Sequence, residues 1–274
     1  MKSLAVYALG LEMDKALRGS VISRIDAFFG GATIYLEPAP ARLWHLFYFG
    51  REPELFAGRS AVIPPEKSAA GLPQLRGGRI KGVNPLGMGR LLVVTVEMPG
   101  DWSQSSDYLL RLDLSTGGKA AALYSAAGGG AVDTMGTGRS RAAPSAETAP
   151  SVRRLSILRL PAEPPDGLLE AAERIGTEDI PEPTMALARA KRAERWLLES
   201  VDGMDPVLAR EITRSVEGDP KEAWAVARRI GGAASDREWS WGRYEFARKR
   251  ESLLYPVELT FADPAERYAD FSVA

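Results

Sequence analysis

The chain has 274 residues, of which 45% are hydrophobic and 26% charged, and its formal net charge is −1. This composition is typical of a folded soluble protein, and the length suits one large domain or two ordinary ones. The absence of cysteine excludes disulfides, thiolate nucleophiles and cysteine-containing metal sites, and a single histidine excludes a histidine-based metal cluster.

The balanced net charge hides an asymmetry along the chain. Residues 1–160 contain 19 Lys and Arg against 13 Asp and Glu, a net charge of +6, whereas residues 161–274 contain 16 against 23, a net charge of −7. A positive first part permits a surface that faces a polyanion. The near-zero total argues against a protein that coats nucleic acid nonspecifically.

The first predicted element is a helix over residues 9–18. Leu9, Met13 and Leu17 follow at the spacing of one helical face, and Gly19 is a typical stop. The segment before it lacks the cleavage site of a secretory signal, so we expect an unprocessed cytoplasmic protein. No apolar run approaches the roughly 18 residues that a membrane span needs, and we expect no membrane partner.

Short aromatic and β-branched segments then predict a series of strands. Gly-Gly and Pro-Ala-Pro breaks separate them, as in hairpins of an antiparallel sheet that forms a sandwich or a strongly bent sheet. His45 falls in one of these segments, which makes it a packed strand residue rather than a catalytic one. The predicted strands cover residues 21–30, 32–38, 42–50, 90–98, 108–114, 119–126 and 130–135.

The second part of the chain is predicted to be helical. Residues 136–151 are small, polar and proline-containing, which indicates a loop or linker, and residues 155–165 add one more extended piece. Helices that begin at Asp or Pro and bury an apolar stripe are expected over residues 166–176, 183–201, 205–216 and 219–232. Residues 255–261 return as a strand. The predicted fold class is α+β, with a β-rich domain over 1–160, a helical domain over 161–235 and a further element over 236–274.

Positive side chains concentrate in one glycine-rich stretch, residues 75–99. Arg76, Arg79, Lys81 and Arg90 surround four glycines there. Glycine lets a backbone approach a ligand closely, and arginine suits bidentate contact with phosphate. The stretch is interpreted either as a phosphate-contacting hairpin or as an ordinary soluble hairpin. It lacks the lysine-hydroxyl pattern of a nucleotide phosphate loop, and no carboxylate pair is marked for acid–base catalysis, so we expect no catalytic residue, cofactor or metal.

A second candidate is the turn before the predicted helix 205–216. Gly203 and Met204 precede this helix and Arg210 lies within it, in an arrangement that resembles a helix-hairpin-helix phosphate site. Asp205 occupies the place where such hairpins usually have a second glycine, and its carboxylate favours an ordinary capped turn instead. Nearby, Arg189, Arg192 and Arg195 share one helical face, which is a solvated face or a binding stripe.

Four segments together resemble the amino-terminal region of the NFACT family, which includes bacterial ribosome quality control factors of the RqcH type and fibronectin-binding protein A. They are "LGLEMDKALRGSVISRIDAFF", "LRGGRIKGVNPLGMGRLLVVTV", "LLESVDGMDPVLAREI" and "YPVELT…ERYADFSVA". The family's Asp-Arg pair corresponds to Gly89-Arg90 here, so the arginine is kept and the carboxylate is absent. Of a second family signature, Gly118 and Lys119 remain.

The resemblance implies a β domain similar to the amino-terminal domain of formamidopyrimidine-DNA glycosylases, followed by a helix-hairpin-helix domain. It implies a noncatalytic RNA-binding module that contacts tRNA and the large ribosomal subunit, with a fibronectin-binding surface adhesin or a glycosylase-like DNA-binding protein as alternatives. The chain lacks the proline-led start of the glycosylases. The implied RNA-binding residues are Arg76, Arg79, Lys81, Gly89, Arg90 and Lys119, and a phosphate contact in the helical hairpin would involve Gly203, Met204 and Arg210.

Overall fold

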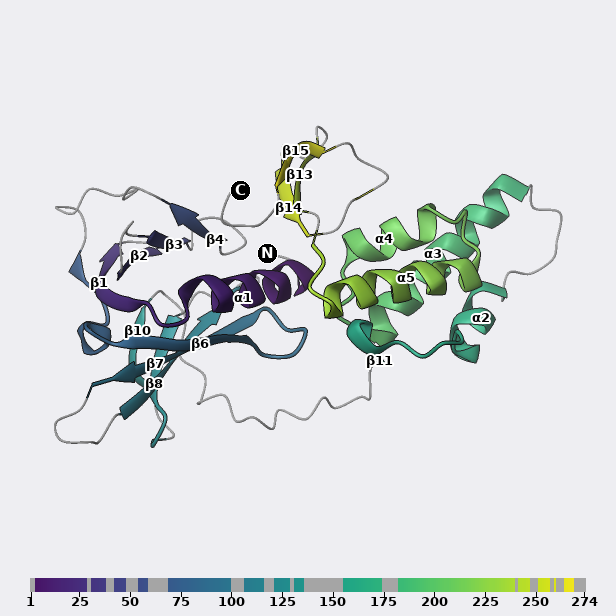
Figure 1. Cartoon of the computed structure of the whole chain (residues 1–274). Coiled ribbons are helices and arrows are strands. Elements are labelled where there is room, and N and C mark those ends of the chain that lie inside the picture. Colours follow the sequence, from purple (N-terminus) through teal and green to yellow (C-terminus); the bar gives the residue numbers. More distant parts are fainter. Residues whose placement is uncertain are drawn as a thin grey trace. The chain divides into compact units, whose positions relative to one another are not determined.

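The computed structural model is of the α+β class predicted from the sequence, and most of its strands are antiparallel (Figure 1). It describes residues 3–28, 31–37, 42–47, 54–58, 69–99, 106–115, 121–128, 131–135, 155–173, 182–239, 241–246, 251–256, 259 and 264–268. The chain divides into two compact units, Met1 with Leu9–Thr148 and Lys2–Ala8 with Ala149–Ala274. The three-part division proposed from the sequence stays a prediction.

One curled antiparallel sheet dominates the first unit. Within the described residues its strands follow the order β10-β9-β8-β7-β6-β1-β2-β3-β4, and β5 pairs with β1. Sequence neighbours pair through hairpins, as the alternating segments predicted. The strands are β1 (Val21–Phe28), β2 (Gly31–Glu37), β3 (Arg42–Phe47), β4 (Glu54–Gly58), β5 (Ala69–Ala70), β6 (Arg79–Pro85), β7 (Leu91–Met98), β8 (Ser106–Asp113), β9 (Ala121–Ser125) and β10 (Ala131–Met135).

The core of this unit lies where the sheet meets helix α1 (Ser3–Leu17). A Cβ atom added at Gly10 would lie 2.7 Å from Leu92 Cδ2, so the helix backbone sits directly on β7. Leu92, Val94 and Val96 alternate along β7 and are buried, the period expected of a strand with one face in the core. Burial of these apolar side chains is the main stabilising term of the unit.

The first helix is longer than the sequence analysis predicted. It begins at Ser3 rather than at residue 9. Leu4, Ala5, Val6 and Ala8 are all buried, so apolar side chains surround this part of the helix and form no single stripe. The search for one amphipathic face therefore missed the first two turns.

Four helices form the bulk of the second unit: α2 (Asp166–Glu173), α3 (Glu182–Ser200), α4 (Pro206–Arg214) and α5 (Pro220–Ser235). The predicted Asp-Pro starts are confirmed for α4 and α5. The Asp219 carboxylate accepts hydrogen bonds from the amides of Lys221 and Glu222, and Asp205 caps α4 in the same way. The extended piece at 155–165 contains β11 (Leu155–Ser156) and the 3₁₀ turn η3 (Ile157–Arg159), and β11 pairs in parallel with β12 (Val201–Asp202).

The end of the chain forms a separate small sheet. Its strands, in the order β14-β13-β15, are β13 (Trp241–Phe246), β14 (Glu251–Tyr255) and β15 (Pro264–Tyr268). The predicted strand over 255–261 is misplaced, because β14 ends at Tyr255, the residue at which that strand was expected to begin. Trp241, Tyr244 and Tyr255 are buried. The predicted loop at 136–151 lies outside the described residues.

Candidate binding surface

The glycine-rich stretch begins with a tight turn that is tied to β1. The 3₁₀ turn η2 (Pro73–Leu75) ends at Arg76, Gly77 donates its amide to the Ile22 carbonyl at 2.8 Å, and the Gly78 carbonyl accepts from the Ile22 amide at 2.8 Å. Gly77 has a φ of +81°. A Cβ at Gly78 would lie 2.5 Å from Val96 Cγ1, so both positions require glycine.

Arg76 and Arg79 are exposed on either side of these two glycines. Arg79 begins β6, where its Cα lies opposite Val21 of β1 and Glu97 of β7. Within the part of the chain that the structure describes, neither guanidinium group has a carboxylate partner. The two arginines are thus held three residues apart on a constrained backbone.

A β-bulge follows Arg79 and changes the direction of β6. The pairing of β6 with β7 shifts between Ile80 and Gly82. The Val83 amide donates to Asp14 Oδ1 of α1 at 2.9 Å, so a helix side chain supplies an acceptor at the distortion. Asp14 Oδ2 also pairs with Arg18 at 2.7 Å. The bulge places Lys81 on the exposed side of β6.

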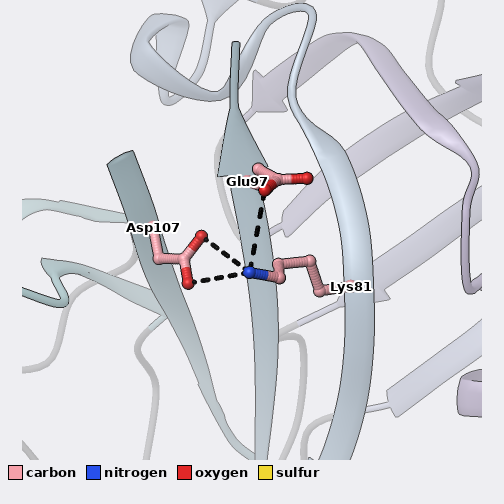
Figure 2. A network of polar contacts seen from close by, with 3 residues as sticks. All are labelled: Lys81, Glu97 and Asp107. Carbon is pink, nitrogen blue, oxygen red and sulfur yellow. Dashed lines mark hydrogen bonds and ion pairs between the residues drawn. The ribbon is translucent and has the colours of Figure 1, made fainter. Parts of the chain in front are cut away.

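Lys81 faces two carboxylates on the neighbouring strands. Its Nζ lies 3.2 Å from Asp107 Oδ2 on β8 and 3.7 Å from Glu97 Oε1 on β7 (Figure 2). The hydrogen bond to Asp107 and the charge of Asp107, with a smaller contribution from Glu97, raise the pKa of Lys81 above its ordinary value. One cation against two carboxylates leaves a net charge of −1 in this cluster, which disfavours a phosphate at Lys81.

The remaining predicted residues of the β unit lie farther along the chain. Gly89 is exposed at the tip of the β6–β7 hairpin, next to the exposed Leu86. Arg90 is half-buried, and its carbonyl accepts from the Leu114 amide at 2.7 Å. Lys119 lies outside the described residues. The RNA contacts of all these residues stay predictions.

The helical hairpin uses its amides internally. Gly203 has a φ of +91°, and Gly203 and Met204 are buried, whereas Arg210 is exposed on α4. Asp205 Oδ1 accepts from the Val207 and Leu208 amides at 2.8 and 3.2 Å. These amides are the donors that a bound phosphate would need, and a carboxylate at the same point repels an anion. The geometry is that of the capped turn.

Tyr255 gives this turn a second function. Its hydroxyl donates to Asp205 Oδ2 at 2.8 Å, so one carboxylate both caps α4 and holds the end of β14. Burial, followed by the charge of Asp205 and the hydrogen bond, raises the pKa of Tyr255 well above its ordinary value. The sequence analysis identified the cap but not this partner, which lies 50 residues away.

The predicted arginine face of α3 is partly neutralised. Arg195 Nε lies 2.9 Å from Glu199 Oε1, a pair four residues apart on one helical face. Arg189 and Arg192 each take part in interactions as well. This face matches the solvated interpretation better than a free binding stripe.

Two further searches of the described residues found no candidate site. No three His, Asp or Glu side chains come together as ligands for a metal ion within that part of the chain. No described helix combines the length and apolar character that a membrane crossing requires.

The fold of the whole chain matches that of solved bacterial proteins named for binding fibronectin or fibrinogen. The fibrinogen-binding protein from Staphylococcus aureus is 11% identical, with a TM-score of 0.67 over 99% of this chain and 96% of that one. The amino-terminal part of the fibronectin/fibrinogen-binding protein from Streptococcus suis is 12% identical, with a TM-score of 0.67 over 100% and 96%.

A third structure extends the likeness. The amino-terminal domain of fibronectin-binding protein PavA from Streptococcus pneumoniae is 13% identical, with a TM-score of 0.55 over 99% of this chain and 95% of that one. Neither a protein-family model nor a curated protein matches the sequence. The chain therefore shares the fold of these proteins, in agreement with the fibronectin-binding part of the resemblance.

Proposed function

We propose that the chain is a noncatalytic binding module whose ligand is a protein of the fibronectin or fibrinogen kind. The observation that carries the proposal is the likeness in fold, which extends over 99% or more of this chain in proteins named for that binding. This reverses the order of preference in the sequence analysis, where RNA was the first ligand and fibronectin the alternative.

Electrostatics on the sheet supports a protein ligand. Binding to nucleic acid depends on cations that neutralise phosphates and release counterions. Lys81 is already paired with Glu97 and Asp107, and Arg24 of β1 lies 3.2 Å from Asp26. Arg24 also stacks at 4.0 Å from the centre of the Tyr35 ring. A surface with both signs of charge and an aromatic group is typical of protein recognition sites.

RNA is the second candidate, and one observation favours it. Arg76 and Arg79 are exposed beside glycines, in a segment that resembles the NFACT family. In this alternative the chain binds tRNA or the large ribosomal subunit, with Arg90 and Lys119 as further contacts. Its affinity would then fall steeply as salt is raised.

Equilibrium binding to immobilised ligands tests the proposal. The purified chain is passed over fibronectin, fibrinogen, bulk tRNA and serum albumin at about 0.15 M salt, where exposed charges farther apart than about 8 Å are largely screened. We expect saturable binding to fibronectin or fibrinogen and none to albumin. Binding to tRNA alone would reject the protein ligand and favour RNA.

Accessibility in the cell is a separate question. An adhesin has to be exposed outside, whereas the sequence analysis expected a cytoplasmic protein. Labelling of intact producing cells with a reagent that does not enter them distinguishes the two. Labelled chain supports the adhesin, and labelling only after lysis contradicts it.

The noncatalytic part of the proposal has its own test. We infer that the β unit is related in fold to the amino-terminal domain of formamidopyrimidine-DNA glycosylases but lacks their chemistry, since the sequence does not begin with their proline nucleophile. Incubation with DNA that contains an oxidised base should release no base. Release above that of a heat-inactivated sample would contradict the noncatalytic assignment.

A further inference from the structure

We propose that Arg76 and Arg79 form a recognition site for an acidic segment of a protein ligand. The inference rests on the proposed function and deepens it, because it names the surface and the chemistry of the partner. The two guanidinium groups are exposed and, within the described residues, have no carboxylate partner. Each is able to bind a carboxylate through two parallel hydrogen bonds.

The backbone that carries the two arginines is ordered before any ligand arrives. The Arg76 amide donates to the Pro73 carbonyl at 3.2 Å, and the Gly78 amide donates to the Leu75 carbonyl at 3.0 Å. Gly77 is bonded to Ile22 of β1 on the other side of the turn. A constrained backbone reduces the entropy lost on binding, so a site of two side chains can bind measurably.

The charges around the turn favour a short acidic segment over RNA. Arg76 and Arg79 add two positive charges beside the Lys81 cluster, whose net charge is −1. The local excess is thus one positive charge. A nucleic acid ligand typically engages about 6–10 phosphates in tight binding, and each contact needs a cation. Two arginines match one or two carboxylates, and the nearby Glu97 and Asp107 repel a continuous phosphate backbone.

A second exposed arginine pair provides a matched control. Arg210 and Arg214 lie four residues apart on α4 and are exposed. Neither has a carboxylate partner among the described residues. Removal of this pair changes the net charge by the same amount as removal of Arg76 and Arg79, so the control separates a specific site from general attraction.

The experiment measures the fluorescence anisotropy of a labelled peptide of about ten glutamates, with a glutamine peptide of equal length as reference. We expect the intact chain to bind the acidic peptide more tightly than the reference. The variant with Arg76→Ala and Arg79→Ala should lose about tenfold in affinity, and the variant with Arg210→Ala and Arg214→Ala should retain it. An equal loss in both variants would overturn the proposal.

Two further arms keep the result unambiguous. The variant with Arg76→Lys and Arg79→Lys keeps the charge but loses the fork, so full affinity in this variant would contradict bidentate recognition. If tRNA binds more tightly than the acidic peptide and loses affinity only in the Arg76, Arg79 variant, the site is an RNA contact and the proposal fails. Circular dichroism should show the same thermal midpoint for all variants, because the substituted side chains are exposed.

The same variants separate this inference from the proposed function. If the chain binds fibronectin or fibrinogen and the Arg76, Arg79 variant binds equally well, the site is wrong and the function stands. If the acidic peptide binds through the two arginines but neither protein binds, the site stands and the ligand assignment is wrong.

Discussion

At the scale of single residues, Asp205 has the largest structural consequence in the helical unit. Its carboxylate caps α4 and accepts the hydroxyl of Tyr255, and both side chains are buried. Asp205→Ala should lower the free energy of unfolding by about 2–4 kcal/mol, since it removes the cap and leaves a buried hydroxyl without its acceptor. Urea denaturation measures this loss.

Two companion variants identify the cause. Tyr255→Phe should cost about 1 kcal/mol, because it removes one hydrogen bond and keeps the ring. In a double-mutant cycle the effects of Asp205→Ala and Tyr255→Phe should fall short of additivity, since both remove the same bond. Strict additivity would contradict the coupling.

Tyr255 also predicts a dependence of stability on alkaline pH. Burial and the Asp205 charge raise the pKa of Tyr255 in the folded chain, so the unfolded chain loses this proton first. The contribution of this group is fully present below about pH 10, the ordinary tyrosine pKa, and falls above it by at most about 1.4 kcal/mol per pH unit. Tyr255→Phe should flatten the fall between about pH 10 and 11.5. Identical pH profiles would reject this assignment.

The turn that carries Arg76 and Arg79 depends on glycine at two positions. Gly78→Ala should destabilise the chain by about 1–3 kcal/mol, because the new Cβ would overlap Val96 Cγ1 and Met98 Sδ, at 2.5 and 2.6 Å. Gly77→Ala meets open space but has to adopt a φ of +81°, and should cost about 1 kcal/mol.

A helical glycine serves as the control for this prediction. Gly232 on α5 is exposed and has open space at its Cβ position. Gly232→Ala should stabilise the chain by about 0.5–1 kcal/mol. If all three substitutions lower the thermal midpoint equally, the turn has no special requirement for glycine.

At the scale of elements, the register of β6, β7 and β8 determines the charge of the candidate surface. Glu97 and Asp107 are paired across the strands, and both reach Lys81. The variant with Glu97→Gln and Asp107→Asn frees Lys81 and should increase tRNA affinity by about tenfold at low salt. Filter binding over a series of salt concentrations measures the change.

The matched control for this variant removes two carboxylates elsewhere. Asp202→Asn with Glu217→Gln changes the net charge equally, at exposed residues of the helical unit. This control should leave tRNA affinity unchanged. If both variants gain equally, the increase follows net charge alone, and the carboxylates beside Lys81 have no specific function.

The same elements explain what was predictable from the sequence. The hairpins, the α+β class and the Asp-Pro helix starts depend on local patterns, and these predictions are confirmed. The pairing of β13 with β14 and β15 depends on contacts between distant segments, so only one strand was expected there, and it was misplaced. Local patterns specify an element better than its partner.

The candidate site was predictable only in part, for the same reason. Arg76, Arg79 and Lys81 were identified from their spacing beside glycines. The acids that neutralise Lys81 come from two other strands, and the bulge after Ile80 decides which face Lys81 occupies. The alternation of Glu97 in a hairpin with Arg79 was a usable signal, because cross-strand neighbours of opposite charge commonly pair.

At the scale of the whole molecule, the likeness in fold and the charge of the surface lead to the same class of ligand. The fold is shared with proteins named for fibronectin or fibrinogen binding across nearly the whole chain. Along the sheet, paired charges leave little excess positive potential for a polyanion. A protein ligand accounts for both observations.

Competition on a single surface tests this conclusion most directly. The chain is first bound to immobilised fibronectin and, separately, to fibrinogen, and bulk tRNA is then added in excess at about 0.15 M salt. We predict that the chain binds at least one of the two proteins saturably and that tRNA does not displace it. Failure to bind either protein, together with saturable binding to immobilised tRNA, would contradict the account.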